Sequence, residues 1–367
     1  MSNLKQVLNL LKFSRGSTRP ISGPAKACWE VTYQCNSDCR GCSRRKNDPN
    51  RKILSTEEGK NLISELGKLN VLSLNLSGGE PMLREDIFEL IYHAKKNTSM
   101  SITMSSNGLL INNEKLIKLS KAGLDIIYLS LDGANSANHD DRRGIKGNFD
   151  KTLKVIDIIR SHRIKDRPKI FINTVVTKKN LEELSEIAVL SEKQGVEGMS
   201  FQLFEKCEEK EYFGDDELEI SPKDAENLRD AVINLLKNHK KLIPVSEEYL
   251  DRFSDYIQDS RMVYEYRCVA GYAYCLIDAY GEVFPCTTKY KSMGNLRDMS
   301  FKDLWFSNDS KNLRDEIKLD KHPPCWFNCI APMNIAMSNV SLTKFHKLLK
   351  PKFMKHIILK AFSKDIN

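Results

Sequence analysis

Three cysteines near the start of the chain have the spacing of an iron–sulfur ligand set. Cys35, Cys39 and Cys42 are separated by three and then two residues on one short stretch. Three thiolates placed in this way can bind three corners of a [4Fe–4S] cube, which leaves the fourth iron open to chelation by a small molecule. The alternative, a closed zinc site, would want four ligands, or three and a water, at a different spacing. We therefore expect an iron–sulfur site here.

A second group of four cysteines lies in the last quarter of the chain. Cys268 and Cys286 flank the turn at 278–281, which predicts that they lie on a hairpin or beside it. Cys325 and Cys329 follow after an intervening segment, and we expect them to lie close to the first pair. Four thiolates fill all four irons of a cube, so this site is expected to relay electrons rather than to chelate substrate. A structural site for zinc uses the same ligand set and remains the alternative.

Alternating strand and helix patterns must position these cysteines. Six strand candidates are largely apolar, as expected for a parallel sheet that is covered on both faces. Their residues are 28–32, 71–76, 101–105, 126–131, 169–176 and 199–203. Ser55 and Glu58 predict a capping box for one intervening helix, whereas Asn112 and Gly123 predict the start and the end of another.

Six strands with intervening helices predict an α/β fold. We expect a partial (β/α)6 TIM-like barrel followed by a small C-terminal Cys-rich auxiliary-cluster domain. Cys35 directly follows the first strand, and the C-terminal ends of the strands are where such barrels carry their chemistry.

Short polar motifs follow successive strands and are similar to those of the radical S-adenosylmethionine (SAM) superfamily. Each motif is weak alone, but their order along the barrel makes coincidence improbable. The matching residues are Gly78, Gly79, Glu80 and Pro81 after the second strand, Ser106 and Asn107 after the third, and Ser130, Asp132 and Arg143 after the fourth.

The resemblance implies that these residues bind SAM. In the family the glycines let the backbone approach the methionyl group of SAM. Carbonyl oxygens and a glutamate at the position of Glu80 bind its amino nitrogen. Residues of the later motifs bind the ribose hydroxyls and the carboxylate of SAM. One position departs from the family pattern, because the residue before the third cysteine is often aromatic and contacts the adenine, whereas here it is Gly41. We expect the adenine of SAM to pack against the strand around Met199 and Phe201.

The second cysteine group resembles the auxiliary-cluster domain called SPASM and its shortened form, twitch. A full SPASM domain has more cysteines after Cys286 and binds two clusters, whereas only Cys325 and Cys329 remain here. The resemblance therefore implies a single auxiliary [4Fe–4S] cluster. The expected divisions are a basic N-terminal segment (1–27), the radical SAM core barrel (28–220), a helical connection (221–261), the auxiliary domain (262–335) and a basic amphipathic tail (336–367).

Three cysteines remain outside these two groups. Cys28 begins the first strand and is expected to be a small core residue. Cys275 is close to the auxiliary ligands in the sequence and is an alternative to Cys268. Cys207 follows the last strand, where it would either donate a hydrogen atom to a substrate radical or simply be a packed thiol.

The charge distribution limits the partners. The net charge is +8, but the basic residues concentrate at both ends and leave the middle acidic. This argues against nucleic acid as a partner, including a zinc-stabilised nucleic-acid module.

The sequence shows no membrane span, no secretory signal and no disulfide framework, so we expect a cytoplasmic protein. Residues 340–367 are basic and amphipathic, and they predict either a helix packed on the barrel or a peripheral contact with an anionic membrane.

The resemblance also implies a mechanism. An external one-electron reductant of the flavodoxin or ferredoxin type would reduce the first cluster, and cleavage of SAM would yield a 5′-deoxyadenosyl radical that takes a hydrogen atom from substrate.

Only 27 residues precede the first strand, which favours a small molecule, sugar or lipid-linked group as substrate over a peptide or protein side chain. An iron–sulfur sensor without SAM cleavage is the alternative of another class, although a sensor needs no methionyl site.

Overall fold

The computed structural model describes residues 2–42, 48, 50–205 and 217–338. Within these residues nine strands form one sheet in the order β6-β5-β4-β3-β2-β1-β7-β8-β9. Strands β1 to β6 pair in parallel, each with the next, and β7 adds to β1 in parallel. The strands are β1 (Lys26–Thr32), β2 (Ser73–Gly78), β3 (Ser101–Ser106), β4 (Ile126–Ser130), β5 (Lys169–Val176), β6 (Gly198–Leu203), β7 (Tyr274–Ile277), β8 (Glu282–Phe284) and β9 (Gly294–Asn295).

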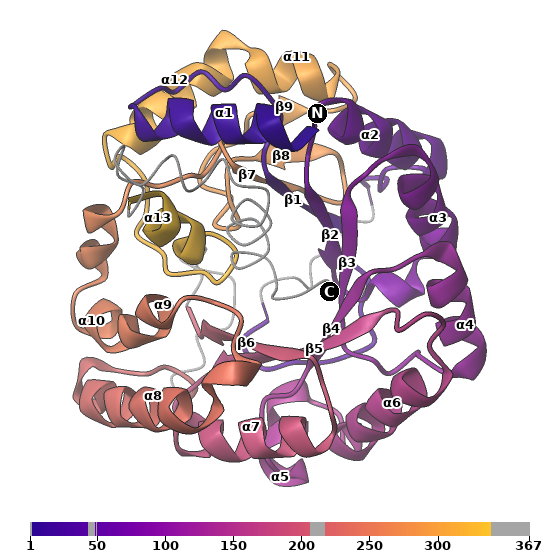
Figure 1. Ribbon diagram of the computed structural model, residues 1–367, viewed down its shortest axis with the longest axis vertical. Coiled ribbons are helices and arrows are strands. Elements are labelled where there is room, and N and C mark those ends of the chain that lie inside the picture. Colours follow the sequence, from indigo (N-terminus) through magenta and orange to yellow (C-terminus); the bar gives the residue numbers. More distant parts are fainter. Residues whose placement is uncertain (1, 43–47, 49, 206–216, 339–367) are drawn as a thin grey trace.

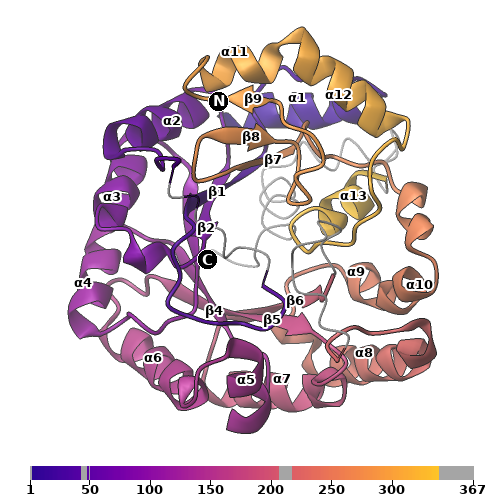
Figure 2. The ribbon, with the colours of Figure 1, turned by 180° about the vertical axis from the view of Figure 1, so that it is seen from behind.

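Helices surround the curved sheet, as Figures 1 and 2 show from its two ends. The α-helices are α1 (Ser2–Ser14), α2 (Thr56–Lys68), α3 (Ile87–Asn97), α4 (Asn113–Ala122), α5 (Ser136–Arg143), α6 (Asn148–His162), α7 (Leu184–Lys193), α8 (Ala225–His239), α9 (Glu247–Asp251), α10 (Phe253–Gln258), α11 (Phe301–Phe306), α12 (Asn308–Lys318) and α13 (Ala331–Ser338). Short 3-10 turns are η1 (Pro81–Leu83), η2 (Leu181–Glu183), η3 (Pro222–Asp224), η4 (Lys240–Leu242) and η5 (Ser260–Glu265). The expected open barrel of parallel strands is confirmed.

The helix boundaries follow from local capping. The Ser55 hydroxyl accepts from the Glu58 amide and the Glu58 carboxylate accepts from the Ser55 amide, so the predicted capping box at the start of α2 is present. Asn112 caps α4, and Gly123 ends it with a left-handed backbone at φ 94°.

The strands are not apolar on both faces, contrary to the expectation from the sequence. Leu74 and Leu76 of β2 are fully buried in the hydrophobic core, whereas the alternate residues Ser73, Asn75 and Ser77 line a cavity inside the barrel. Residues along a strand alternate between the two faces of a sheet, so one face is apolar and contacts helices while the other is polar. The interior of this barrel is therefore a polar lumen.

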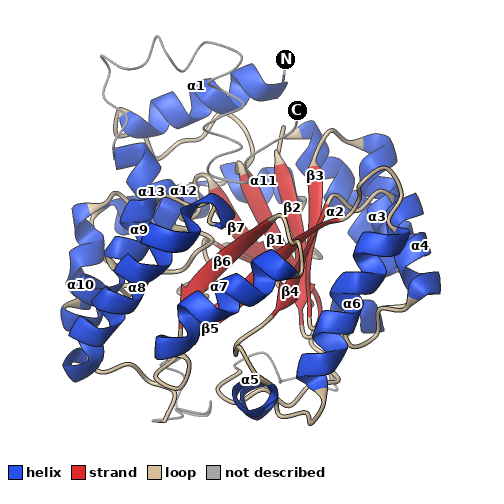
Figure 3. Cartoon of the chain, turned by 60° about the horizontal axis from the view of Figure 1, so that its bottom comes forward, coloured by secondary structure: helices blue, strands red, loops and turns tan. Residues whose placement is uncertain are grey.

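The cysteine-rich section extends the barrel sheet instead of forming a sheet of its own. Strand β7 pairs with β1 in the register Lys26 with Tyr274 and Cys28 with Leu276, and the hairpin β7–β8 then turns back antiparallel. Figure 3 shows β7 beside the other strands. This arrangement places the second cysteine group at the open side of the barrel.

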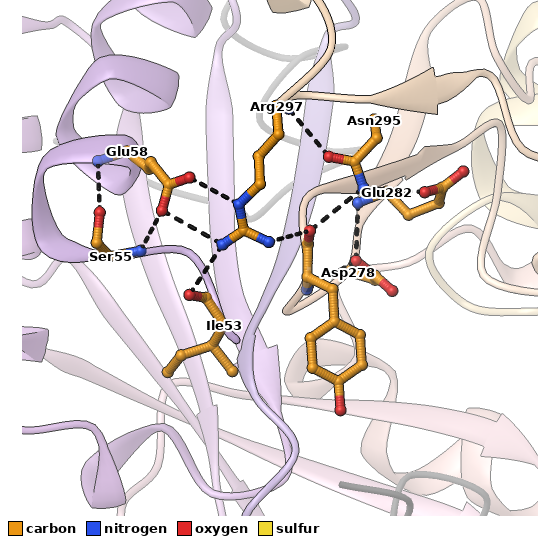
Figure 4. A network of polar contacts seen from close by, with 8 residues as sticks. Ile53, Ser55, Glu58, Asp278, Glu282, Asn295 and Arg297 are labelled. Atoms are coloured by element: carbon orange, nitrogen blue, oxygen red, sulfur yellow. Dashed lines mark hydrogen bonds and ion pairs between the residues drawn. The ribbon is translucent and has the colours of Figure 1, made fainter. Parts of the chain in front are cut away.

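Polar contacts also join the two sections outside the sheet (Figure 4). The Arg297 guanidinium donates to the Glu58 carboxylate at the start of α2 and to the carbonyl oxygens of Ile53 and Tyr280. Asn295 donates to the Tyr280 carbonyl and to Glu282, which holds the hairpin turn in place.

Two expectations fall on residues outside the described part of the chain. These are the role of Cys207 and the membrane contact of the tail from 340 onward. Among the described helices, none has the length and apolar character needed to cross a bilayer.

Candidate functional site

A cavity of about 170 Å³ opens at the C-terminal ends of β1 to β4. The three cysteines of the first group share it with residues from the motifs that follow the successive strands. Its lining is Cys35, Ser37, Cys39, Cys42, Ser77, Gly78, Gly79, Ser105, Ser106, Asn107, Ser130 and Arg143. Parallel strands bring their carboxyl ends to one edge, which is why residues far apart in the sequence meet here.

Two side chains from other motifs hold the cysteine loop. Asn107 donates from its amide nitrogen to Asn36 Oδ1 at 2.8 Å and to Ser37 Oγ at 2.9 Å. Arg143 is buried and its guanidinium approaches Cys39 Sγ at 3.7 Å. The loop is therefore fixed by the structure around it.

Glu80 is fully buried and does not line the cavity, although the sequence predicted that it would bind the SAM amino group. One of its carboxylate oxygens accepts from Met82 N at 3.0 Å and from Ser106 Oγ at 2.9 Å, and the other accepts from Asn107 N at 2.7 Å. Burial raises the pKa of the Glu80 carboxyl, which these donors oppose. Glu80 thus ties the second motif to the third. Pro81 begins the 3-10 turn η1 beside it and is buried.

Asp132 also lies behind the cavity, not at it. Its side chain is buried and pairs with Arg143 Nη2 at 2.7 Å, while its second oxygen accepts from Val175 N at 2.8 Å. Asp132 therefore orients Arg143, which does line the cavity.

The glycines of the second motif allow a close backbone approach. A Cβ atom on Gly78 would collide with the Thr32 carbonyl oxygen, and one on Gly79 would collide with the Gln34 carbonyl oxygen. Gly78 also has φ 123°, which disfavours other residues. The result is a wall of bare backbone next to the cysteines, which suits a ligand bound through main-chain groups.

Phe204 occupies the space left by Gly41. A Cβ atom on Gly41, whose φ is 65°, would lie 2.5 Å from Cε2 of the Phe204 ring. A ring from the residue after β6 thus packs directly against Gly41, which leaves no room there for a side chain. Met199 and Phe201 do not line the described cavities, because both are fully buried in the hydrophobic core. The strand alternates its faces and turns Ser200 and Gln202 to the lumen, so the assignment of Met199 to adenine gains no support from this placement and stays a prediction.

The second cysteine group converges beside the hairpin β7–β8. Cys268, Cys286 and Cys325 line a cavity of about 10 Å³. Burial raises the pKa of Cys268 to about 12 and raises that of Cys325 well above its ordinary value. Buried thiols of this kind ionise only next to a strong positive charge, so bound metal suits the set.

Cys329 completes this group from the lumen side. It lines the barrel cavity, and its sulfur lies 3.1 Å from the Thr287 hydroxyl. Cys275 is elsewhere: it faces Ala27 in the β1–β7 pairing, is fully buried, and has Cys28 and Arg314 as its charged neighbours. The structure therefore brings Cys268, and not Cys275, to the group.

A larger cavity of about 330 Å³ fills the lumen between the two cysteine groups. Ser77 and Ser105 line both this cavity and the one around the first group. The remaining polar lining is Lys26, Glu30, Ser73, Asn75, Ser101, Thr103, Asn173, Ser200, Gln202, Thr287 and Asn328. Sequence reasoning missed these residues, although the strict polar–apolar alternation of SLNLSG and SITMSS was a signal for them.

Cys28 packs against the hydrophobic core, as expected, but it also faces this lumen. It lines the cavity and is partly exposed, because it shares the inward face of β1 with Lys26 and Glu30.

The donor sets fit clusters better than single ions. Among the residues that the structure describes, no three His, Cys, Asp or Glu side chains converge closely enough for one metal ion. A cube gives each thiolate its own iron, so its sulfur ligands need not converge on one point.

Comparison with known proteins agrees with this geometry. The signature described as the radical SAM superfamily matches residues 29–190, and that of SPASM, an iron–sulfur cluster-binding domain, matches residues 268–330. The AdoMet-dependent heme synthase of Methanosarcina barkeri (strain Fusaro / DSM 804) is 30% identical over 314 residues, which are 81% of this chain and 87% of that protein. The chain belongs to the radical SAM superfamily. It is an enzyme that uses SAM and [4Fe–4S] clusters.

Other relatives of this radical SAM enzyme carry different names. Mycofactocin maturase MftC of Mycolicibacterium smegmatis is 30% identical over 312 residues, 83% of this chain and 75% of that protein. The fold is shared with SuiB of Streptococcus suis (TM-score 0.64, 18% identity, covering 85% of this chain and 72% of that one). It is also shared with anSMEcpe with bound AdoMet (TM-score 0.60, 19% identity, 78% and 82%).

Proposed function

We propose that this radical SAM enzyme modifies a polar small molecule, sugar or lipid-linked group held in the barrel lumen. Cys268, Cys286, Cys325 and Cys329 would hold a single auxiliary [4Fe–4S] cluster that exchanges an electron with the substrate. One observation carries the proposal: the lumen cavity begins at Ser77 and Ser105, which also line the first site, and reaches Cys329 of the second.

The first cluster would be held by Cys35, Cys39 and Cys42, with SAM against the backbone of Gly78 and Gly79. When bound and reduced, this cluster supplies the electron that cleaves SAM to methionine and a 5′-deoxyadenosyl radical. Ser130, Ser106 and Asn107 present hydroxyl and amide groups to the same cavity. The protein's own contribution is to place the reacting groups and to exclude water from between them.

The lumen lining favours an uncharged substrate with polar groups. Seryl, threonyl and amide side chains lie beside apolar and aromatic ones such as Leu72, Tyr128 and Phe171. Asn328 is held by Ser200 Oγ at 2.9 Å and by Gln202 Oε1 at 2.6 Å. The charged groups Lys26 and Glu30 lie on one strand, and Glu30 is paired with Lys289 at 3.0 Å. Hydroxyl and amide groups recognise hydroxyls and amides of a ligand by hydrogen bonds.

Modification of a peptide or protein side chain is the second candidate. The mycofactocin maturase is as similar to this chain as the heme synthase is, so similarity alone does not select one substrate class. A side chain inserted into the same lumen would meet the same polar residues.

Anaerobic reconstitution tests the proposal first. Wild-type enzyme should bind about eight irons per chain, as two four-iron clusters require, and should form 5′-deoxyadenosine with SAM and a flavodoxin or ferredoxin reductant. About four irons with zinc would contradict the auxiliary cluster. Absence of 5′-deoxyadenosine under all these conditions would contradict the assigned SAM site.

The substrate class requires a second experiment. Enzyme incubated with size-fractionated extract from cells grown in deuterated medium should transfer deuterium into 5′-deoxyadenosine from the fraction that contains substrate. Transfer that survives protease treatment of the fraction supports the small-molecule proposal, whereas transfer abolished by protease supports the peptide candidate.

A further inference from the structure

Two consecutive threonines contact sulfurs of the second cysteine group. The Thr287 hydroxyl lies 3.1 Å from Cys329 Sγ, and the Thr288 hydroxyl lies 2.8 Å from Cys286 Sγ. They face opposite sides, because Thr287 lines the lumen cavity and Thr288 lines the small cavity of the cysteine group. Thr287 is therefore the threonine on the substrate side.

The donor and acceptor roles at Thr287 follow from counting hydrogens. A thiolate ligand has no hydrogen, so the single hydroxyl hydrogen of Thr287 must point to Cys329 Sγ. The Tyr274 hydroxyl lies 3.2 Å from Thr287 Oγ1 and also interacts with Cys329. Tyr274 is buried and lines the same cavity. Two hydroxyl groups, those of Thr287 and Tyr274, therefore lie beside Cys329 on the lumen side.

We propose that Thr287 is a positioning residue that raises the reduction potential of the auxiliary cluster through its hydrogen bond to Cys329. The inference rests on the proposed function, because it requires the second cysteine group to hold a redox-active cluster. Reduction adds one negative charge to the cluster, part of which reaches the cysteine sulfurs, and a hydroxyl donor stabilises this reduced state more than the oxidised state. Hydrogen bonds to cluster sulfurs and ligand basicity are established ways in which proteins tune such potentials.

Redox titration followed by electron paramagnetic resonance tests this without substrate or turnover. Thr287→Val has nearly the shape of threonine but lacks the hydroxyl. We expect a fall of about tenfold in the equilibrium constant for one-electron reduction of the auxiliary cluster, which is about 59 mV. Thr287→Ser retains the hydroxyl and should restore the wild-type potential. The potential of the first cluster should stay constant in both variants.

Three further variants make the result specific. Thr103→Val makes the same change in the lumen but on β3, and it should leave the auxiliary potential unchanged. Thr288→Val removes the other hydroxyl–sulfur contact and should lower the potential, which calibrates the measurement. Tyr274→Phe removes the other hydroxyl beside Cys329 and should also lower the potential, and Thr287→Ala replaces Thr287→Val if the latter loses its cluster.

The possible outcomes distinguish a failure of the proposed function from a failure of the inference about Thr287. Wild-type enzyme with no second cluster signal would overturn the proposed function together with this inference. Two cluster signals in wild type, with an auxiliary potential that neither Thr287→Val nor Thr287→Ala lowers, would overturn only the inference about Thr287.

Discussion

The guanidinium of Arg297 donates to both carboxylate oxygens of Glu58, with Nε–Oε1 at 2.8 Å and Nη2–Oε2 at 3.4 Å. This pair joins the loop after β9 to the first turn of α2, and Figure 4 shows Glu58 also closing the capping box with Ser55. Hydrogen bonding from Arg297 lowers the pKa of Glu58 to about 2. One carboxylate thus stabilises a helix terminus and the contact between two sections of the chain.

Glu58→Gln should lower the free energy of unfolding by about 1 kcal/mol at pH 7, a modest value because both side chains are more than one third exposed. The folded-state pKa of Glu58 is depressed, so its contribution is complete above the ordinary value of 4.5 and is lost as pH falls toward 2. Urea unfolding of the holoenzyme should therefore show a constant difference between pH 7 and 5 that shrinks below about pH 4.5. A difference that grows with acidity would contradict this account.

Gly41→Ala should destabilise the protein and reduce occupancy of the first cluster, because the new Cβ meets the Phe204 ring at 2.5 Å. Gly147→Ala is a matched control, since Gly147 has φ 79° and nothing within 4 Å of the added atom. The control should cost only about 1 kcal/mol of backbone strain, and Gly41→Ala should cost more.

Phe204→Leu combined with Gly41→Ala should recover the excess cost but not the backbone strain. Thermal melting and iron content of the two single variants and the double variant measure this coupling. Strictly additive effects would show that Phe204 does not occupy the space beside Gly41.

Asp132→Asn should destabilise the enzyme by about 3 kcal/mol or more, because it leaves the buried Arg143 guanidinium without its carboxylate partner. Asp132→Asn with Arg143→Gln removes the unpaired charge and should lose less. Urea unfolding and SAM binding by the reconstituted enzyme measure the two effects. Glu114→Gln, in an exposed pair with Lys118, should leave stability nearly unchanged.

Cys268→Ser should leave about four irons per chain, whereas Cys275→Ser should leave about eight. The reason is placement, since Cys268 shares a cavity with Cys286 and Cys325 while Cys275 is packed against β1. Iron and sulfide quantitation after anaerobic reconstitution decides between them. Loss of four irons in Cys275→Ser alone would reverse the ligand assignment.

Much of the fold and of the first site was predictable from local sequence. The spacing of Cys35, Cys39 and Cys42 depends on only eight residues of chain, and the capping of α2 and α4 depends on neighbours three positions apart. Strand order also followed, because strands joined by single helices lie side by side in a parallel sheet. The matched residues 29–190 and 268–330 confirm the family that these motifs predicted.

A motif does not show which way each of its side chains points. Glu80 and Asp132 belong to motifs that surround the first cavity, yet both are buried behind it and contact Ser106, Asn107 and Arg143. Their roles toward SAM, and that of Met199, stay predictions, since a shift of one residue along a strand changes the face of the sheet.

The sequence by itself determined the chemistry of this protein, because iron–sulfur ligands and glycine-rich approaches are set by residue types at short spacing. Only the tertiary structure decided which polar side chains meet in the lumen, that Cys28 joins them and Cys275 does not, and that Phe204 fills the place beside Gly41. These contacts join residues that are tens to hundreds of positions apart. Their geometry depends on the pairing of β7 with β1 and on the alternation of strand faces. Patterns of neighbouring residues in the sequence specify neither.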